Sequence, residues 1–225
     1  TDSSTYLSQM SILNKEKTEK YKYNFADFYV CDMSLRPDGA GAVVCGNSSL
    51  NGEMNSSVYV FNFSEKEPLI TYEFPDLMLV SVHYLSNRYL VAIGDKSIIF
   101  IDIKKKEKKE IGYSSKTLKC MDIDKNWGLL CHFSSECEDE KNKLVFFDKS
   151  GETKFEFNIP VPIEKCLRYG NKILGIRDKN MLIYDISGNL KNKIDMENIP
   201  VGILKISSSA VGVLENKVLK KVNVF

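Results

Sequence analysis

Five ionisable side chains stand at similar places in five successive segments of the sequence, each inside a short apolar run. They are Asp32, His83, Asp122, Arg168 and Lys205. Two carboxylates, an imidazole and two cations could serve as acid, base and counter-ion if the fold brought them to a common pocket. Inner strands that only face water carry such residues too. We therefore treat the five as candidate binding residues that line a central channel.

The remaining reactive residues predict no catalytic, cofactor or metal site. His83 and His132 are the only histidines and lie in different segments, so two separately packed histidines are favoured over a shared site. Asp122 to Gly128 resembles the start of a calcium loop, but the glycine comes one place late and the twelfth position is Phe133. A hairpin turn is expected there. No serine lies in a G-x-S-x-G elbow.

The cysteines do not form a recognisable redox or zinc motif. There are six of them, and none is in a C-x-x-C pair: Cys31, Cys45, Cys120, Cys131, Cys137 and Cys166. In a chain with a core of this size, reduced and buried thiols are favoured over disulfides. Cys131 and Cys137 are close enough in sequence to bridge a loop. The disulfide state therefore stays open.

Composition excludes several classes of partner. The 225 residues are 43% hydrophobic and 27% charged, with 31 Lys plus Arg against 30 Asp plus Glu and a net charge of +1. This balance gives no broad electrostatic reason to expect nucleic acid. No apolar run approaches the roughly 20 residues of a membrane helix. The basic run 104–109 and the acidic residues of 136–140 are expected to be solvated hairpin loops.

A repeated phrase explains how the candidate residues are positioned. Apolar strands that end in Asp or Asn before a polar turn occur at VYVFN, IIFID, LVFFD and LIYD, and SILN opens the series. Counted along the sequence, successive Asp or Asn positions are 48, 40, 46 and 37 residues apart. That period, with several short strands in each, is typical of β-propeller blades. Asp148 is expected to cap the turn that follows LVFFD.

The chain is therefore predicted to be all-β, a propeller or partial propeller of four-stranded antiparallel blades in one domain over 1–225. About five blades are visible, in units 1–25 (partial), 26–75, 76–114, 115–160, 161–200 and 201–225 (partial). In each blade the first strand lines the centre and the fourth, most polar strand lies at the rim. A long loop is expected around Asn51 and Gly52. Two strands at the start and three at the end favour a segment of a larger propeller, with a five-bladed ring as the alternative.

The sequence also resembles a known family. The resemblance rests on STYLSQMSILNKEKTEKY, CDMSLRPDGAGAVVC, IGDKSIIFID and the loop before VYVFN. It points to an uncharacterised bacterial family of propeller-like proteins, found mostly in Firmicutes. The resemblance implies a cytoplasmic tail and one membrane helix ahead of extracytoplasmic repeats, so a removed upstream anchor is expected. The family is a domain of unknown function and implies no site residue.

Two functions follow as hypotheses. The first is a non-enzymatic recognition or scaffold module at the bacterial cell surface, whose loops bind a protein, peptide or glycan. The second is an enzyme or small-ligand receptor in which Asp32, His83, Asp122, Arg168 and Lys205 line a channel. No cofactor or nucleic acid is expected, and the membrane enters only through the upstream anchor.

Overall fold

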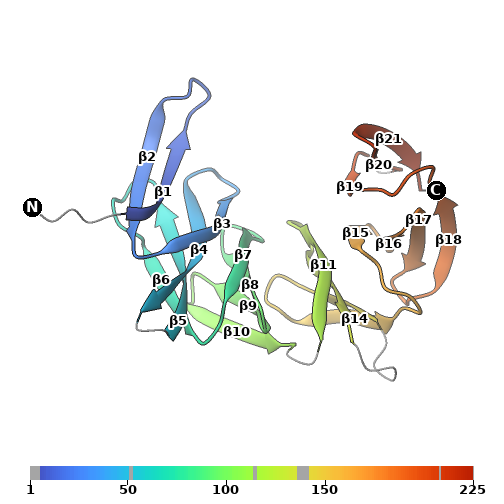
Figure 1. Cartoon of the computed structure of the whole chain (residues 1–225), viewed down its shortest axis with the longest axis horizontal. Coiled ribbons are helices and arrows are strands. Elements are labelled where there is room, and N and C mark those ends of the chain that lie inside the picture. Colours follow the sequence, from blue (N-terminus) through green and yellow to red (C-terminus); the bar gives the residue numbers. More distant parts are fainter. Residues whose placement is uncertain (1–5, 51–52, 114–115, 136–141, 208, 225) are drawn as a thin grey trace, which may run out of the picture. The chain divides into compact units, whose positions relative to one another are not determined.

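The structure is a computed structural model, and it describes residues 6–50, 53–113, 116–135, 142–207 and 209–224. Within these ranges the chain contains 21 strands and no helix. It follows that no described helix has the length and apolarity needed to cross a membrane. The chain forms two compact units, residues 1–114 and 115–225. Each unit is built from antiparallel sheets of consecutive strands (Figure 1).

The first unit contains a two-stranded sheet and two four-stranded sheets. Their strands are β1 (Tyr6–Leu13) and β2 (Glu19–Ala26), then β3 (Tyr29–Leu35), β4 (Gly41–Leu50), β5 (Glu53–Asn62) and β6 (Ile70–Pro75), then β7 (Leu79–Tyr84), β8 (Tyr89–Gly94), β9 (Ser97–Asp102) and β10 (Glu107–Gly112). The first strands of the two four-stranded sheets, β3 and β7, lie side by side.

The second unit contains two four-stranded sheets and a three-stranded sheet. Their strands are β11 (Thr117–Asp124), β12 (Gly128–Ser134), β13 (Lys143–Phe147) and β14 (Thr153–Asn158), then β15 (Lys165–Tyr169), β16 (Lys172–Arg177), β17 (Asn180–Asp185) and β18 (Leu190–Asp195), then β19 (Gly202–Lys205), β20 (Ala210–Glu215) and β21 (Val218–Asn223). Here too the first strands are neighbours, β11 beside β15 and β15 beside β19.

The core lies between successive sheets, as expected for stacked blades. One apolar cluster joins β11–β14 to β15–β18 through residues such as Leu130, Phe146 and Ile173. A second joins β15–β18 to the last sheet. The middle strands are almost wholly buried, whereas β10, β14 and β18 are mostly exposed and charged. This confirms the predicted order from an apolar middle to a polar rim.

The repeated Asp caps its turn, as the sequence predicts. Asp148 Oδ1 accepts hydrogen bonds from the amides of Ser150 (2.9 Å) and Glu152 (3.1 Å). Asp185 makes the same pair of bonds to Ser187 and Asn189, both at 2.9 Å. The carboxylate thus satisfies amides that the turn leaves without backbone partners.

Asn51 and Gly52 lie outside the described residues, but the prediction of a long loop on either side of them is wrong, because β4 and β5 pair as far as Leu50 and Glu53. The polar residues of this segment predict a loop, but in the structure their side chains bond to buried partners. Asn47 Oδ1 accepts the amide of Leu79 at 3.0 Å, and Ser56 Oγ donates to the carbonyl of Leu77. These bonds tie the hairpin to the following sheet, β7–β10.

The other sequence expectations can be placed briefly. The basic run 104–109 is exposed at the β9–β10 hairpin, as expected. Residues 136–140, with the acidic loop and Cys137, lie outside the described residues. The proposed Cys131–Cys137 bridge is therefore untested, and so is the single domain over 1–225.

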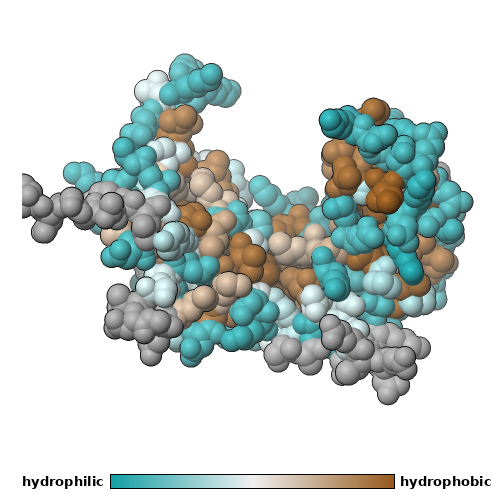
Figure 2. Space-filling view, in the orientation of Figure 1, coloured by the Kyte–Doolittle hydropathy of each residue, from teal (hydrophilic) through white to brown (hydrophobic). Residues whose placement is uncertain are grey.

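The last sheet has one apolar face turned away from β15–β18. By strand alternation this face carries Leu204, Leu214 and Leu219, with Ile206 just beyond β19. Leu204 and Ile206 are each 45% exposed and Leu219 is 54% exposed. Figure 2 shows apolar surface in this part of the unit among hydrophilic turns.

Candidate binding site

In the first unit the structure brings together two of the five predicted residues, Asp32 on β3 and His83 on β7. The Oδ2 atom of Asp32 accepts a hydrogen bond from the amide of Val82 at 3.0 Å. His83 Nε2 lies 3.8 Å from the same oxygen and makes no hydrogen bond among the described residues. Burial lowers the pKa of His83, although the nearby Asp32 carboxylate opposes this shift. The imidazole is thus a neutral base at physiological pH.

The other three predicted residues, Asp122, Arg168 and Lys205, lie on the first strands of the second unit, β11, β15 and β19. Asp122 Oδ2 accepts the amide of Arg168 at 2.8 Å, which repeats the bond between Asp32 and Val82. An aspartate on one first strand therefore fastens the next first strand in both units. This shared geometry is a structural role, and it accounts for the similar placement of the two aspartates.

Arg168 points into the protein. Only 8% of the Arg168 surface is exposed. Its guanidinium lies over the rings of Phe146 and Trp127, at 4.1 and 4.7 Å from their centroids. Its Nε also donates to the carbonyl of Gly170 at 3.2 Å. Burial lowers the pKa of the guanidinium, and the Asp124 carboxylate opposes that shift. Arg168 therefore contacts the ring of Trp127 through a cation–π interaction.

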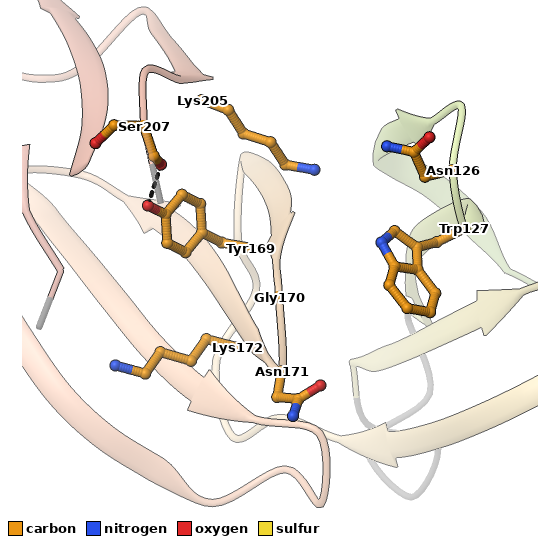
Figure 3. Close-up of a pocket in the computed structure, with 8 residues that line it drawn as sticks. All are labelled: Asn126, Trp127, Tyr169, Gly170, Asn171, Lys172, Lys205 and Ser207. Carbon is orange, nitrogen blue, oxygen red and sulfur yellow. Dashed lines mark hydrogen bonds between the residues drawn. The ribbon is translucent and has the colours of Figure 1, made fainter. Parts of the chain in front are cut away.

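A pocket of about 700 Å³ lies next to these residues in the second unit. The turns between the first and second strands of three successive sheets line it, with Asn126, Trp127, Tyr169, Gly170, Asn171, Lys172, Lys205 and Ser207. Figure 3 shows the indole of Trp127 and the amide of Asn126 on one side, with Lys205 extending from the other side toward them. The side chain of Lys172 points away, and its ammonium donates to the carbonyl of Val224 at 3.0 Å.

The walls of this pocket are held by hydrogen bonds. The hydroxyl of Tyr169 donates to the carbonyl of Ser207, which joins the second turn to the third (Figure 3). Asp124 holds the first turn, since its Oδ1 accepts the amide of Asn126 at 2.9 Å and its backbone carbonyl accepts that of Trp127 at 3.0 Å. The expected hairpin at DIDKNWG is confirmed. The turn leaves Trp127 56% exposed.

The charges beside the pocket are largely compensated. The ammonium of Lys205 pairs with the carboxylate of Asp124. Burial raises the pKa of Asp122, whereas its bond from Arg168 and the charge of Lys205 act in the other direction. Burial alone would also raise the pKa of Asp124, but the hydrogen bonds from Lys205 and Asn126 outweigh it and lower the pKa. The pocket thus offers an aromatic surface, amide groups and a paired ammonium.

Sequence reasoning selected the strands of this region and missed the turns. Asp122 and Arg168 do not line the pocket; of the five candidates only Lys205 does. Trp127, Asn126 and Asn171 were not predicted. A signal existed, because the only tryptophan of the chain stands in a hairpin turn, where packing does not require it. Whether any of the five candidates binds a ligand stays a prediction. In the described residues no group of three or more potential ligand side chains could hold a metal ion.

A family model described as "Family of unknown function (DUF5711)" matches residues 2–224. The chain belongs to this family. No curated protein matches the DUF5711 chain. The match confirms the expectation of a family of unknown function.

Solved structures similar to the DUF5711 chain include β-propellers. The β-propeller domain of Cps50 (Swd1) from Myceliophteria thermophila has a TM-score of 0.59 and 10% identity, and the match covers 96% of this chain and 76% of that one. The C-terminal WD40 domain of Sif2 has a TM-score of 0.60 and 16% identity, with 96% and 61% covered. A Bacteroides caccae protein of unknown function has a TM-score of 0.50 and 13% identity, with 82% and 73% covered. At these identities the likeness concerns the fold, and it confirms the predicted propeller architecture.

Proposed function

We propose that this DUF5711 chain is a non-enzymatic recognition module at the bacterial cell surface, and that the pocket of its second unit binds a glycan. Trp127 carries the proposal. An indole that is 56% exposed on a turn has no packing role that explains it, yet Arg168 holds its ring in place. A large, rigid aromatic surface fixed beside a pocket is a common anchor for ligands.

The surrounding groups favour a sugar over a charged peptide. A sugar ring has an apolar C–H face that can pack on an indole, and its hydroxyls both donate and accept hydrogen bonds. The amides of Asn126 and Asn171 also offer both donors and acceptors. Asp124 already pairs with Lys205, and the side chain of Lys172 points away toward the carbonyl of Val224, so neither ammonium is placed to pair with an anionic peptide.

The surface location is a part of the proposal that rests on sequence. The segments quoted above resemble bacterial extracytoplasmic proteins held by one upstream membrane helix. The net charge of +1 supports neither a nucleic acid nor a direct electrostatic attachment to an anionic membrane. The expected partner is therefore outside the membrane, reached by a tethered propeller.

A second candidate is an enzyme or small-ligand receptor at the same place. Asp122 and Asp124 are two residues apart on β11, and their pKa values are moved in opposite directions. Such a split assigns a proton donor and a carboxylate base in many acid–base sites. Against this, Asp122 already accepts the Arg168 amide and does not line the pocket.

A glycan microarray carrying bacterial surface oligosaccharides tests both candidates with the purified chain. We expect binding that Trp127→Ala abolishes and that Tyr29→Ala preserves, since Tyr29 is a comparably exposed aromatic residue in the first unit. Binding that survives Trp127→Ala, or no glycan binding at all, would contradict the proposal. Shortened oligosaccharide products that disappear in Asp122→Asn would instead support the enzyme.

A further inference from the structure

Three reactive side chains meet where the sheet β11–β14 packs on β15–β18. Cys120 on β11 pairs in register with His132 on β12, so the two side chains share a face of the sheet. Cys166 lies on β15 and belongs to the apolar cluster between the two sheets, against which Cys120 also packs. These residues do not line the pocket described above.

The imidazole of His132 is the unusual member of this cluster. It is fully buried, and neither ring nitrogen makes a hydrogen bond within the described part of the chain. A buried polar side chain without partners costs stability, so its position calls for an explanation. A neutral imidazole next to a thiol can accept its proton and stabilise the thiolate that results.

The two thiols are suited to different steps of one reaction. The neighbouring Cys166 thiol lowers the pKa of Cys120, and although burial acts in the opposite direction, the imidazole of His132 and the charge of Lys165 lower it further. The same thiol–thiol contact, followed by burial, raises the pKa of Cys166 well above its ordinary value, with Asp122 acting in the same direction. Cys120 is partly exposed, whereas Cys166 is 5% exposed.

The other described cysteines do not share these features. Cys31 is exposed and lies in the first unit, where Asn47 Nδ2 donates to its sulfur at 2.9 Å. Cys131 precedes His132 on β12, so strand alternation places it on the opposite face of the sheet from His132. It is fully buried, and burial raises its pKa well above the ordinary value.

We propose that Cys120 and Cys166 form a reversible disulfide between the two sheets, with His132 as the base that activates Cys120. The oxidant is a small disulfide such as glutathione disulfide. His132 accepts the Cys120 proton, and the thiolate attacks one sulfur of the oxidant, releasing the other as a thiolate. The released thiolate takes the proton of Cys166. The Cys166 sulfur then attacks the Cys120 sulfur and displaces the second thiolate, which takes its proton from His132. Two protein thiols are thereby oxidised, and one disulfide is reduced to two thiols.

This redox site is independent of the proposed glycan binding. The bond would join β11 to β15, the strands that the hydrogen bond between Asp122 and Arg168 already fastens. Oxidation is therefore expected to stabilise the second unit by linking two neighbouring sheets.

The test uses the reduced full chain and glutathione disulfide at pH 7, with free thiols blocked before digestion. Mass spectrometry should find the Cys120 and Cys166 peptides linked, with the loss of two hydrogens. Cys166→Ser should stop the reaction at a glutathione adduct on Cys120, and Cys31→Ser, the matched control, should leave the linkage intact. Cys120 should also react with iodoacetamide more than tenfold faster than Cys31 at pH 7, because a pKa of about 6 leaves Cys120 mostly thiolate, whereas burial raises the pKa of Cys31 and leaves it almost wholly protonated.

His132→Gln should slow the alkylation of Cys120 but leave it faster than that of Cys31, because the Cys166 thiol, the larger cause of the lowered pKa, remains. If this variant does not fold, the pH profile of alkylation in the wild-type chain decides, with a midpoint for Cys120 below that for Cys31. Linkage of either cysteine to Cys131 or Cys137, a glutathione adduct on Cys31 alone, equal alkylation rates, or one equivalent of bound zinc in the purified protein would overturn the proposal.

Discussion

Two substitutions of Asp148 separate the two roles of its carboxylate in the β13–β14 turn, which are turn capping and ion pairing. Oδ1 accepts the amides of Ser150 and Glu152, and Oδ2 pairs with the ammonium of Lys154 at 2.8 Å. Asp148→Asn can keep the Oδ1 bonds and loses the ion pair, whereas Asp148→Ala loses both. Burial alone would raise the pKa of Asp148, but the bonds from Lys154 and Ser150 lower it to about 2.

The magnitude follows from that shift. A fall from 3.8 to about 2 corresponds to an upper limit of roughly 2.5 kcal/mol at 1.36 kcal/mol per unit. The side chains of Asp148 and Lys154 are 26% and 54% exposed, so solvent screening reduces the contribution to about 1 kcal/mol. We therefore expect Asp148→Ala to lower the free energy of unfolding by about 1 kcal/mol and the melting temperature by about 2–4 °C.

Urea denaturation of wild type, Asp148→Asn and Asp148→Ala at pH 7 measures these differences. The asparagine variant should lose less than about 0.5 kcal/mol, the scale of an exposed ion pair. Because the folded-state pKa lies below the unfolded one, the carboxylate's contribution is complete above about pH 4 and is lost as the pH falls toward 2. Equal losses in the two variants would refute the assignment of Asp148 as a turn cap.

Three further predictions concern the second unit. Gly128→Ala should lower the free energy of unfolding by about 3 kcal/mol, because a Cβ at φ +140° would collide with the carbonyl of Phe147. Gly112→Ala is the control and should lower it far less, because a Cβ there meets no atom. Similar losses for the two variants on urea denaturation would contradict this prediction. Asp122→Ala should cost about 2 kcal/mol by leaving the Arg168 amide without a partner, as measured by urea denaturation. Asp122→Asn should be at least as stable as wild type at pH 7. The pKa of Asp122 is raised in the folded state, so ionisation of this carboxyl lowers the stability of the wild-type fold as the pH rises, and asparagine removes that cost. A large loss of stability in Asp122→Asn would contradict the raised pKa.

The fold was largely predictable because each repeat marks the end of a strand with an Asp or Asn and a polar turn. Apolar runs that end in Asp102, Asp148 or Asp185 identify third strands, and the carboxylates cap the turns as expected. The pairing of β4 with β5 as far as Leu50 and Glu53 was not predictable from local pattern. Asn47 and Ser56 on these strands bond to β7 and to the chain just before it, which are far away in sequence.

The candidate sites show the same division. The placement of Asp32 and Asp122 in equivalent positions was visible in the sequence, but their bonds to the next first strand depend on packing between sheets. The pocket is formed by turns of three sheets, and Cys120 and Cys166 are separated in the sequence by three strands, β12 to β14. Neither assembly leaves a local motif.

The fluorescence of Trp127 tests the central claim most directly, because it is the only tryptophan in the chain and every tryptophan signal comes from the proposed pocket. In the free protein its emission should be that of a solvent-exposed indole and should be quenched by iodide. Saturation with a glycan selected on the microarray should shift the emission to shorter wavelength and protect it from iodide. Saturable glycan binding with unchanged emission and quenching would place the site elsewhere and contradict the account.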